Sequence, residues 1–234
     1  MTRCLNCLVL VMLLAAIGGA QNATKASIPP DATVTFECYW EPATPQRYVI
    51  AVPETGNARY TSQSPQQSPD ANGVADEDYQ LEFAASPAVR ARIFQLAEQA
   101  GYFHGDFDFK KHAIANTGNK TLSYRDATKQ FSTVYNWSEN PAIDQLTRIF
   151  HRISVTIEHG RKLKFLRRFD KLGLEAELKG MERQAELHEL AELQIIGTLL
   201  ENIANDAAVL NIARQRARRL LEQSKVEGWE TKGQ

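Results

Sequence analysis

The chain has 234 residues and is close to electroneutral, with 27 Lys and Arg against 28 Asp and Glu. This balance argues against nucleic acid as a partner, because nucleic-acid-binding domains usually carry a strongly basic surface. The length allows one large domain or two small ones.

Residues 1–20 have the order of a secretory signal peptide. One Arg precedes an uninterrupted apolar run at residues 7–17, and small residues follow at 18–20. A spanning helix needs about 20 apolar residues, so the run is too short for one. We therefore expect cleavage before Gln21 and a periplasmic or extracellular mature protein, with a retained membrane anchor as the alternative. Cleavage leaves Cys38 alone, which excludes an intramolecular disulfide and favours a buried thiol.

The next part of the chain is rich in predicted strands. Residues 21–32 are polar with a Pro pair and are expected to form a flexible mature N-terminus. Residues 64–78 are almost all Pro, Gln, Ser, Asp, Asn and Gly, and are expected to form a mobile loop. Alternating, β-branched and aromatic residues predict strands at residues 34–40, 47–52, 58–62, 79–83, 120–124 and 131–137.

Two helix starts are marked by a capping residue followed by Pro, at Ser86 and at Asn140. After residue 160 almost every segment is helix-forming and there is no Pro. We therefore expect an α+β fold. A small antiparallel sheet with two helices occupies residues 33–159, an all-helical C-terminal extension occupies 160–223, and a polar tail occupies 224–234.

The first part resembles an uncharacterised family of small exported bacterial α+β domains of unknown function. The resemblance covers roughly residues 33–158 and rests on Tyr48, Gly56, Tyr60, Leu96, Gly101, Tyr102 and Phe103. It implies the fold of this part. It implies no activity and no catalytic residue.

Standard catalytic motifs are missing, so no cofactor is expected and an enzyme is disfavoured. The strongest candidate site is the cluster of His104, Asp106, Asp108 and His112. Two imidazoles and two carboxylates within nine residues have the chemistry to bind a divalent metal or to act as acid and base. A half-buried edge segment explains the same pattern, because the polar residues alternate with phenylalanines, and we therefore assign no metal.

Charge alternates along the helical extension. Arg161, Lys164, Arg168 and Lys171 share one helix face, residues 174–192 are acidic, and residues 206–223 are basic again. This order favours helices that pack with their charged flanks paired, although each exposed pair contributes only about 0–1 kcal/mol. Contact with an anionic membrane surface through the stretch from Arg161 to Lys171 is the less favoured alternative.

The last helices carry the most regular apolar pattern of the chain. We expect a buried stripe or an interaction surface formed by Leu193, Ile196, Leu200, Ile203, Leu210 and Leu221. Asn205 and Asp206 favour a break that makes a helical hairpin, whereas one long helix in a dimer is the alternative.

Two functions follow from these observations. The first is an exported, non-catalytic envelope protein, a binding or interaction module that docks an unknown protein partner or itself through its C-terminal helices. The second is an exported metal-dependent hydrolase that uses the cluster from His104 to His112. The lack of catalytic motifs favours the first.

Overall fold

A computed structural model describes residues 28–63 and 78–226 of the chain. The expected signal peptide, nearly all of the expected mobile loop and most of the polar tail lie outside these ranges. The expected flexible N-terminus reaches into them, and there the structure differs from the prediction. Ala32 is fully buried, and its N–H donates to the carbonyl oxygen of Pro29 at 3.0 Å, which closes a turn before the first strand.

Six strands form one antiparallel sheet, close to the six predicted segments. Their order across the sheet is β4-β3-β2-β1-β5-β6, and every neighbouring pair is antiparallel. The strands are β1 (Thr33–Tyr39), β2 (Arg47–Pro53), β3 (Ala58–Gln63), β4 (Tyr79–Phe83), β5 (Asn119–Arg125) and β6 (Gln130–Tyr135). The α+β class predicted from the sequence is therefore confirmed.

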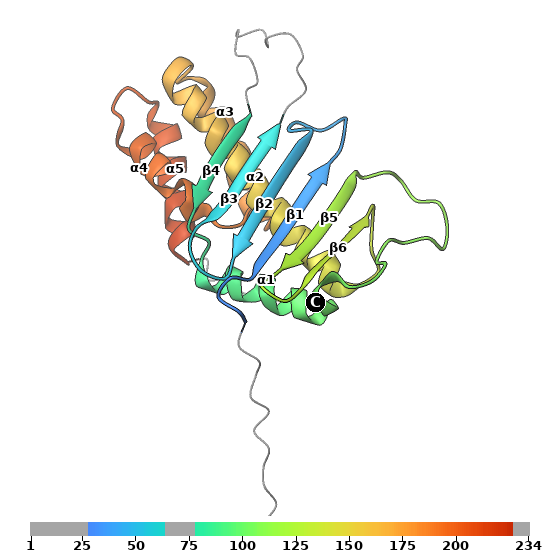
Figure 1. Ribbon diagram of the computed structural model, residues 1–234. Helices are drawn as coiled ribbons and strands as arrows, with labels where there is room; N and C mark the ends of the chain where they lie inside the picture. Colours follow the sequence, from blue (N-terminus) through green and yellow to red (C-terminus); the bar gives the residue numbers. More distant parts are fainter. Residues whose placement is uncertain (1–27, 64–77, 227–234) are drawn as a thin grey trace, which may run out of the picture.

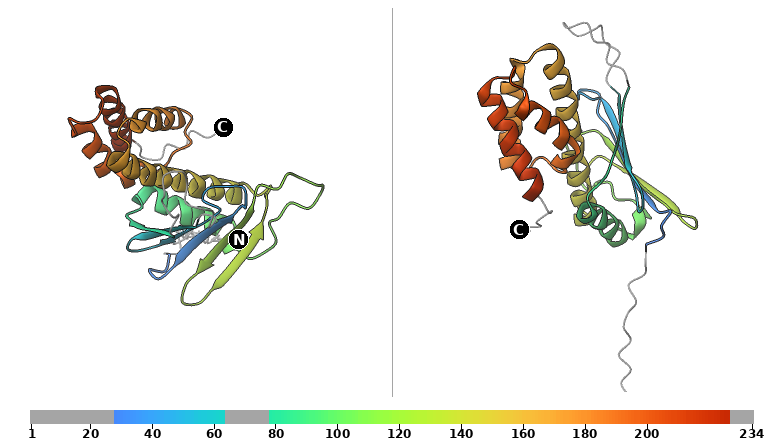
Figure 2. Two further views of the ribbon diagram at one scale, coloured as in Figure 1. Left: turned by 90° about the horizontal axis from the view of Figure 1, so that it is seen from above. Right: turned by 90° about the vertical axis from the view of Figure 1, so that its left-hand side faces the viewer.

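One face of the sheet is covered by helices α1 (Pro87–Gln99) and α2 (Pro141–Phe169), as Figure 1 and Figure 2 show. The inward positions alternate along each strand and place Phe36, Ile50 and Leu122 in one transverse row, all fully buried. The ring of Phe36 stacks on Phe150 of α2 at 5.2 Å between centroids. Among the described residues, no helix or strand lies on the opposite face.

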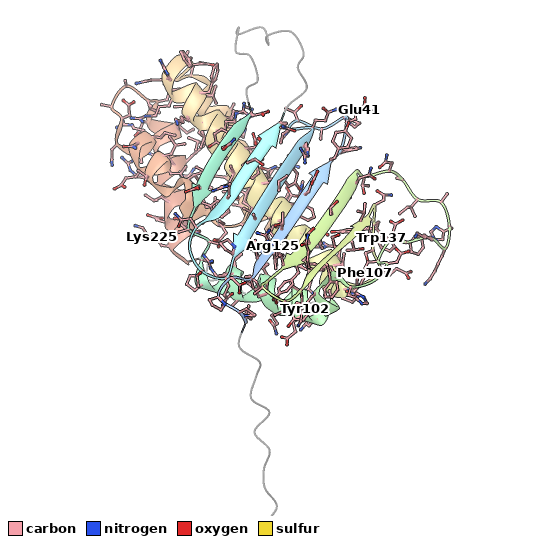
Figure 3. All side chains as sticks on the ribbon, viewed as in Figure 1. Glu41, Tyr102, Phe107, Arg125, Trp137 and Lys225 are labelled. Atoms are coloured by element: carbon pink, nitrogen blue, oxygen red, sulfur yellow. The ribbon has the colours of Figure 1, made fainter. Side chains whose placement is uncertain are left out.

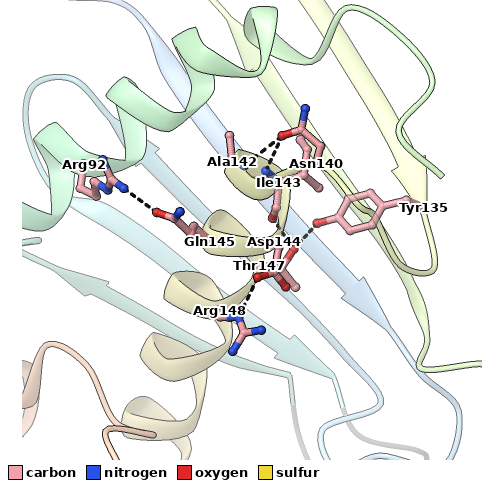
Figure 4. Close-up of polar contacts among 9 residues, drawn as sticks. All are labelled: Arg92, Tyr135, Asn140, Ala142, Ile143, Asp144, Gln145, Thr147 and Arg148. Atoms are coloured by element: carbon pink, nitrogen blue, oxygen red, sulfur yellow. Dashed lines mark hydrogen bonds and ion pairs between the residues drawn. The ribbon is translucent and has the colours of Figure 1, made fainter. Parts of the chain in front are cut away.

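Both predicted helix starts are confirmed. Ser86 caps α1 by accepting from the N–H of Val89, and Asn140 caps α2 by accepting from the N–H groups of Ala142 and Ile143. Figure 4 shows how the start of α2 is held by its surroundings. Tyr135 of β6 contacts Thr147 at 2.6 Å, and Arg92 of α1 donates to Gln145 at 2.5 Å. The first turns of α2 are therefore fixed both to the sheet and to α1.

The expected boundary at residues 159 and 160 falls inside α2, which is continuous over 29 residues. The part of α2 up to Ile157 packs in the core beneath the sheet, with Ile149, Ile153 and Ile157 buried there. Leu163, further along, belongs to a second core formed with the C-terminal helices. α2 thus lies between the sheet and these helices and is shared by both cores (Figure 2).

The C-terminal helices are short and pack on one another. They are α3 (Gly173–Glu186), α4 (Gly197–Asn205) and α5 (Asn211–Val226), with single 3-10 turns η1 (Gly101–Phe103) and η2 (Leu193–Ile196) elsewhere. α4 and α5 are separated by a turn and pack against each other, so the hairpin prediction is confirmed. None of the helices in the described ranges is both long enough and apolar enough to cross a bilayer.

The predicted pairing of acidic and basic helices is also confirmed. Arg216 of α5 bridges to Glu175 at 3.2 Å and also contacts Glu182, which receives Arg219 at 2.7 Å. Lys162 of α2 reaches Glu177 of α3 at 2.6 Å. The acidic α3 therefore lies between two basic helices.

Candidate binding site

The outer face of β1, β5 and β6 carries two short rows of polar side chains. Strand register places Thr33, Arg125 and Gln130 in one row, and Thr35, Ser123 and Ser132 in the next. Adjacent strands lie about 4.8 Å apart and same-face residues along a strand about 6.8 Å apart, so the six side chains form one compact patch. We call these six residues the polar patch.

The polar patch lies in a hollow of about 670 Å³ on the uncovered side of the sheet. The hollow is lined by Thr33, Thr35, Ser123, Tyr124, Arg125, Gln130, Phe131 and Ser132. Its side-chain donors are therefore hydroxyl groups, one amide and one guanidinium. Figure 3 labels Arg125 near the end of β5, on the side of the sheet turned toward the viewer.

Arg125 is the cation of this hollow, and no carboxylate pairs with it among the described residues. The two other arginines that project from this face differ. Arg47 contacts Glu37 at 2.7 Å, and Arg59 contacts Glu82 at 3.1 Å. A guanidinium presents a planar fork of N–H donors that matches a carboxylate or a phosphate. Arg125 is thus placed to receive an anion from outside the chain.

The carboxylate nearest to Arg125 in sequence is engaged elsewhere. Asp126 Oδ1 accepts from the backbone N–H groups of Thr128 and Lys129, and Oδ2 accepts from the hydroxyl of Tyr124. These bonds, with that from Thr128 foremost, lower the pKa of Asp126 to about 2. Asp126 therefore shapes the turn between β5 and β6 and leaves the neighbouring guanidinium available.

A smaller hollow of about 180 Å³ lies on the other half of the same face, over β2, β3 and β4. Its arginine is Arg47, which is held by Glu37 and also donates to Gln63 at 3.3 Å. The charge of this second hollow is therefore balanced internally, in contrast to that of the polar patch.

The predicted cluster of His104, Asp106, Asp108 and His112 does not converge in the structure. The ring of His104 packs edge-on against Phe131 at 4.8 Å, whereas His112 packs against Phe109 at 4.7 Å. Asp106 pairs with Lys110 at 2.5 Å, and Asp108 accepts from the N–H of Asn136 at 2.9 Å. The two histidines thus have separate aromatic partners.

A hollow of about 480 Å³ contains Asp106 and Asp108 but neither histidine. In the described ranges, no three His, Cys, Asp or Glu side chains gather closely enough to hold a metal ion. The alternation of Asp with Phe in this segment belongs to a half-exposed loop, and the geometry gives the hydrolase hypothesis no support.

The predicted apolar stripe lies mostly inside the helical layer. Leu193, Leu200 and Ile203 are fully buried, Ile196 is nearly so, and Leu221 is half-buried. Leu210 departs from the expectation, because it lies on the turn before α5 and is 47% exposed. The stripe is thus the core of the C-terminal helices, and as a set its residues offer no docking surface.

A row of polar groups on the inner face was missed by sequence reasoning. Register aligns Tyr48, Cys38, Lys120 and Tyr135, and the hydroxyl of Tyr48 lies 3.5 Å from Nδ1 of His151 on α2. Burial raises the pKa of the Cys38 thiol, which disfavours the nucleophilic thiolate. Lys120 Nζ donates to backbone oxygens of residues 117, 118 and 136. These contacts connect the sheet to α2 and to the neighbouring loop backbone, and we assign them a structural role.

No protein-family model and no curated protein matches this chain. Its function therefore has to follow from its own sequence and geometry.

Proposed function

We propose that this protein is an exported, non-catalytic binding module that holds a small anionic ligand in the polar patch. The observation that supports it most directly concerns Arg125. Its guanidinium pairs with no carboxylate of residues 28–63 or 78–226, and it lies in a hollow whose other side-chain donors are uncharged. The guanidinium fork binds the carboxylate or phosphate of the ligand. Hydroxyl groups of Thr35, Ser123 and Ser132 bind its neutral polar groups.

Export is supported by the sequence of residues 1–20, whose run of apolar residues and small residues is typical of a cleaved signal. N-terminal sequencing of the protein from its native host tests this part. We expect Gln21 at the mature terminus. Retention of Met1 on a membrane-bound protein would contradict export in soluble form.

The ligand class is tested with two sugars that differ by one charged group. Glucuronate carries a carboxylate and glucose does not. A site built on Arg125 should therefore bind glucuronate and not glucose. We expect glucuronate to shift the backbone amide resonances of Thr35, Ser123 and Ser132 in a saturable way in NMR titrations. Glucose should leave these resonances unmoved. Glucose 6-phosphate is titrated in the same way, and tighter binding than that of glucuronate would show a preference for phosphate over carboxylate.

Two arginine variants provide the matched control. Arg125→Gln should abolish the shifts at the polar patch. Arg59→Gln removes an exposed guanidinium from the same face, one that Glu82 already occupies. It should leave the titration unchanged. Equal shifts in wild type and Arg125→Gln, or none with either anion, would sink the assignment of the polar patch.

A further inference from the structure

Two turns of the helical layer, between α2 and α3 and before α5, lie at the same end of the molecule (Figure 1). Each turn carries exposed large apolar side chains. Phe169 and Leu172 flank the turn between α2 and α3 and are 64% and 72% exposed. Leu210 and Ile212 flank the start of α5 and are 47% and 48% exposed. We call these four residues the apolar tip.

A polar contact holds the two turns together. Lys171 Nζ donates to Asp206 Oδ2 at 2.8 Å, and Arg167 approaches the same carboxylate at 4.0 Å. Lys171 lies between Phe169 and Leu172, and Asp206 begins the turn that leads to Leu210. The two turns that carry the apolar tip therefore lie side by side.

Two side chains of the apolar tip, Phe169 and Leu172, are unusually exposed for this molecule. Among the described residues, no other large apolar side chain is as exposed as Phe169 or Leu172. An apolar side chain stabilises the folded state in proportion to the area that it removes from water. Phe169 and Leu172 therefore contribute little to the stability of the fold. Exposed apolar residues gathered on neighbouring turns are typical of an interaction site.

The charge around the apolar tip indicates its partner. Residues 164–172 and 205–214 together carry five Lys and Arg against two Asp, whereas the whole chain has a net charge of −1. Lys164 and Arg168 are exposed, and the guanidinium of Arg168 lies 4.9 Å from the ring centre of Phe169. Apolar residues next to basic ones are the pattern of a segment that lies in the interface of an anionic bilayer.

We propose that the apolar tip docks this protein peripherally on an anionic membrane surface. Phe169, Leu172 and Leu210 enter the headgroup region, and Lys164 and Arg168 pair with lipid phosphates. A second copy of the chain is a poorer occupant. A two-fold interface would place the same basic surface on both partners and set like charges against each other.

Co-sedimentation with lipid vesicles tests the docking, with the chain purified without residues 1–20. We expect binding to phosphatidylglycerol vesicles that weakens with added salt, and little binding to phosphatidylcholine vesicles. The double variant Phe169→Ser with Leu172→Ser should bind roughly tenfold or more weakly, because it removes the apolar anchors. Leu187→Ser is the matched control, since Leu187 is 56% exposed but lies at the far end of α3, and it should bind as wild type.

A second measurement locates the contact. Leu172→Trp places an indole in the apolar tip, and its emission should shift to the blue on phosphatidylglycerol vesicles. The variants are expected to keep the wild-type melting temperature, because the replaced side chains are exposed. Absence of binding to the anionic vesicles would overturn the inference. So would equal binding by the double serine variant, or a dimer in sedimentation velocity that the double variant dissociates.

Discussion

The carboxylate of Glu192 receives two hydrogen bonds from Ser86, from its N–H at 2.6 Å and from its hydroxyl at 2.7 Å. Ser86 is the capping residue of α1, so a buried acid just before η2 completes the start of a helix 106 residues earlier. Glu192 also adopts a left-handed backbone with φ of 60°, a conformation that costs energy for a residue with a side chain. The negative charge lies at the positive end of the helix dipole.

Replacement of Glu192 should therefore destabilise the fold well beyond the effect of a surface change. We expect Glu192→Ala to lower the free energy of unfolding by roughly 1.5–3 kcal/mol, because it removes hydrogen bonds to a charged group. Glu186→Ala, at an exposed position nearby in sequence, should change it by less than about 0.5 kcal/mol. Urea denaturation of both variants measures the difference. Equal loss in the two would show that the contact with Ser86 contributes nothing.

Two glycines in helices should respond to alanine in opposite directions. A Cβ on Gly160 would collide with the side chain of Ile196, whereas a Cβ on Gly180 meets nothing within 4 Å. We expect Gly160→Ala to cost about 1–3 kcal/mol through overpacking. Gly180→Ala should stabilise by up to about 1 kcal/mol, because alanine is the better helix former.

The collision at Gly160 also predicts a coupling that thermal melting can detect. The double variant Gly160→Ala with Ile196→Ala should cost less than the sum of its two single variants, because the smaller side chain makes room. Strict additivity would contradict the close approach of η2 to α2.

The apolar stripe of the last helices separates into buried and exposed leucines. Leu200 is fully buried, so Leu200→Ala should cost about 2–5 kcal/mol. Leu210→Ala should cost far less, because this side chain is 47% exposed. The midpoint of denaturation is expected to be independent of protein concentration, since the stripe packs within one chain. A midpoint that rises with concentration would instead indicate an oligomer.

Acid should weaken the contact between α3 and α5. Burial alone would raise the pKa of Glu182, but hydrogen bonds from Arg219 and Arg216 outweigh it and lower the pKa from its ordinary value of 4.5. A carboxylate with a lowered folded-state pKa stabilises the fold above pH 4.5. That contribution is lost as the pH falls from there through the folded-state pKa.

Comparison with Gln isolates this effect. Glu182→Gln should be less stable than wild type at neutral pH, and the difference should shrink as the pH falls from 4.5 through the lowered folded-state pKa, where the wild-type acid becomes protonated. Glu186→Gln, at an exposed position, is the control and should follow wild type throughout. Denaturation curves recorded at neutral pH and at a pH below 4.5 measure the difference in stability between each variant and wild type. An unchanged difference between Glu182→Gln and wild type would contradict the assigned ion pairs.

The elements of this fold are readable from sequence where their causes are local. Capping by Ser86 and Asn140 involves neighbours within three residues, and strand alternation is a period of two. The sequence did not predict that α2 continues through Gly160, because glycine commonly ends a helix. Here glycine is needed inside the helix because the side chain of Ile196, distant in sequence, packs where a Cβ would lie.

The polar patch could not be predicted from the sequence, because it depends on contacts between distant parts of the chain. Ser123 and Arg125 alternate with buried Leu122 and Tyr124, and this pattern marks them as outward-facing. Their alignment with Thr35 and Ser132 depends on the register of three strands, which the sequence does not state. The opposite error concerned His104 and His112, where closeness in sequence suggested convergence and separate aromatic partners prevent it.

The continuity of α2 has a geometric consequence for orientation. Its 29 residues form a rod about 44 Å long. One end is anchored beside β6, and the other carries Phe169 of the apolar tip. A protein docked through that tip would hold the uncovered face of its sheet at a fixed angle and a fixed height above the lipid surface. The helix would act as a rigid spacer, so that Arg125 would bind its ligand at a constant distance from the bilayer.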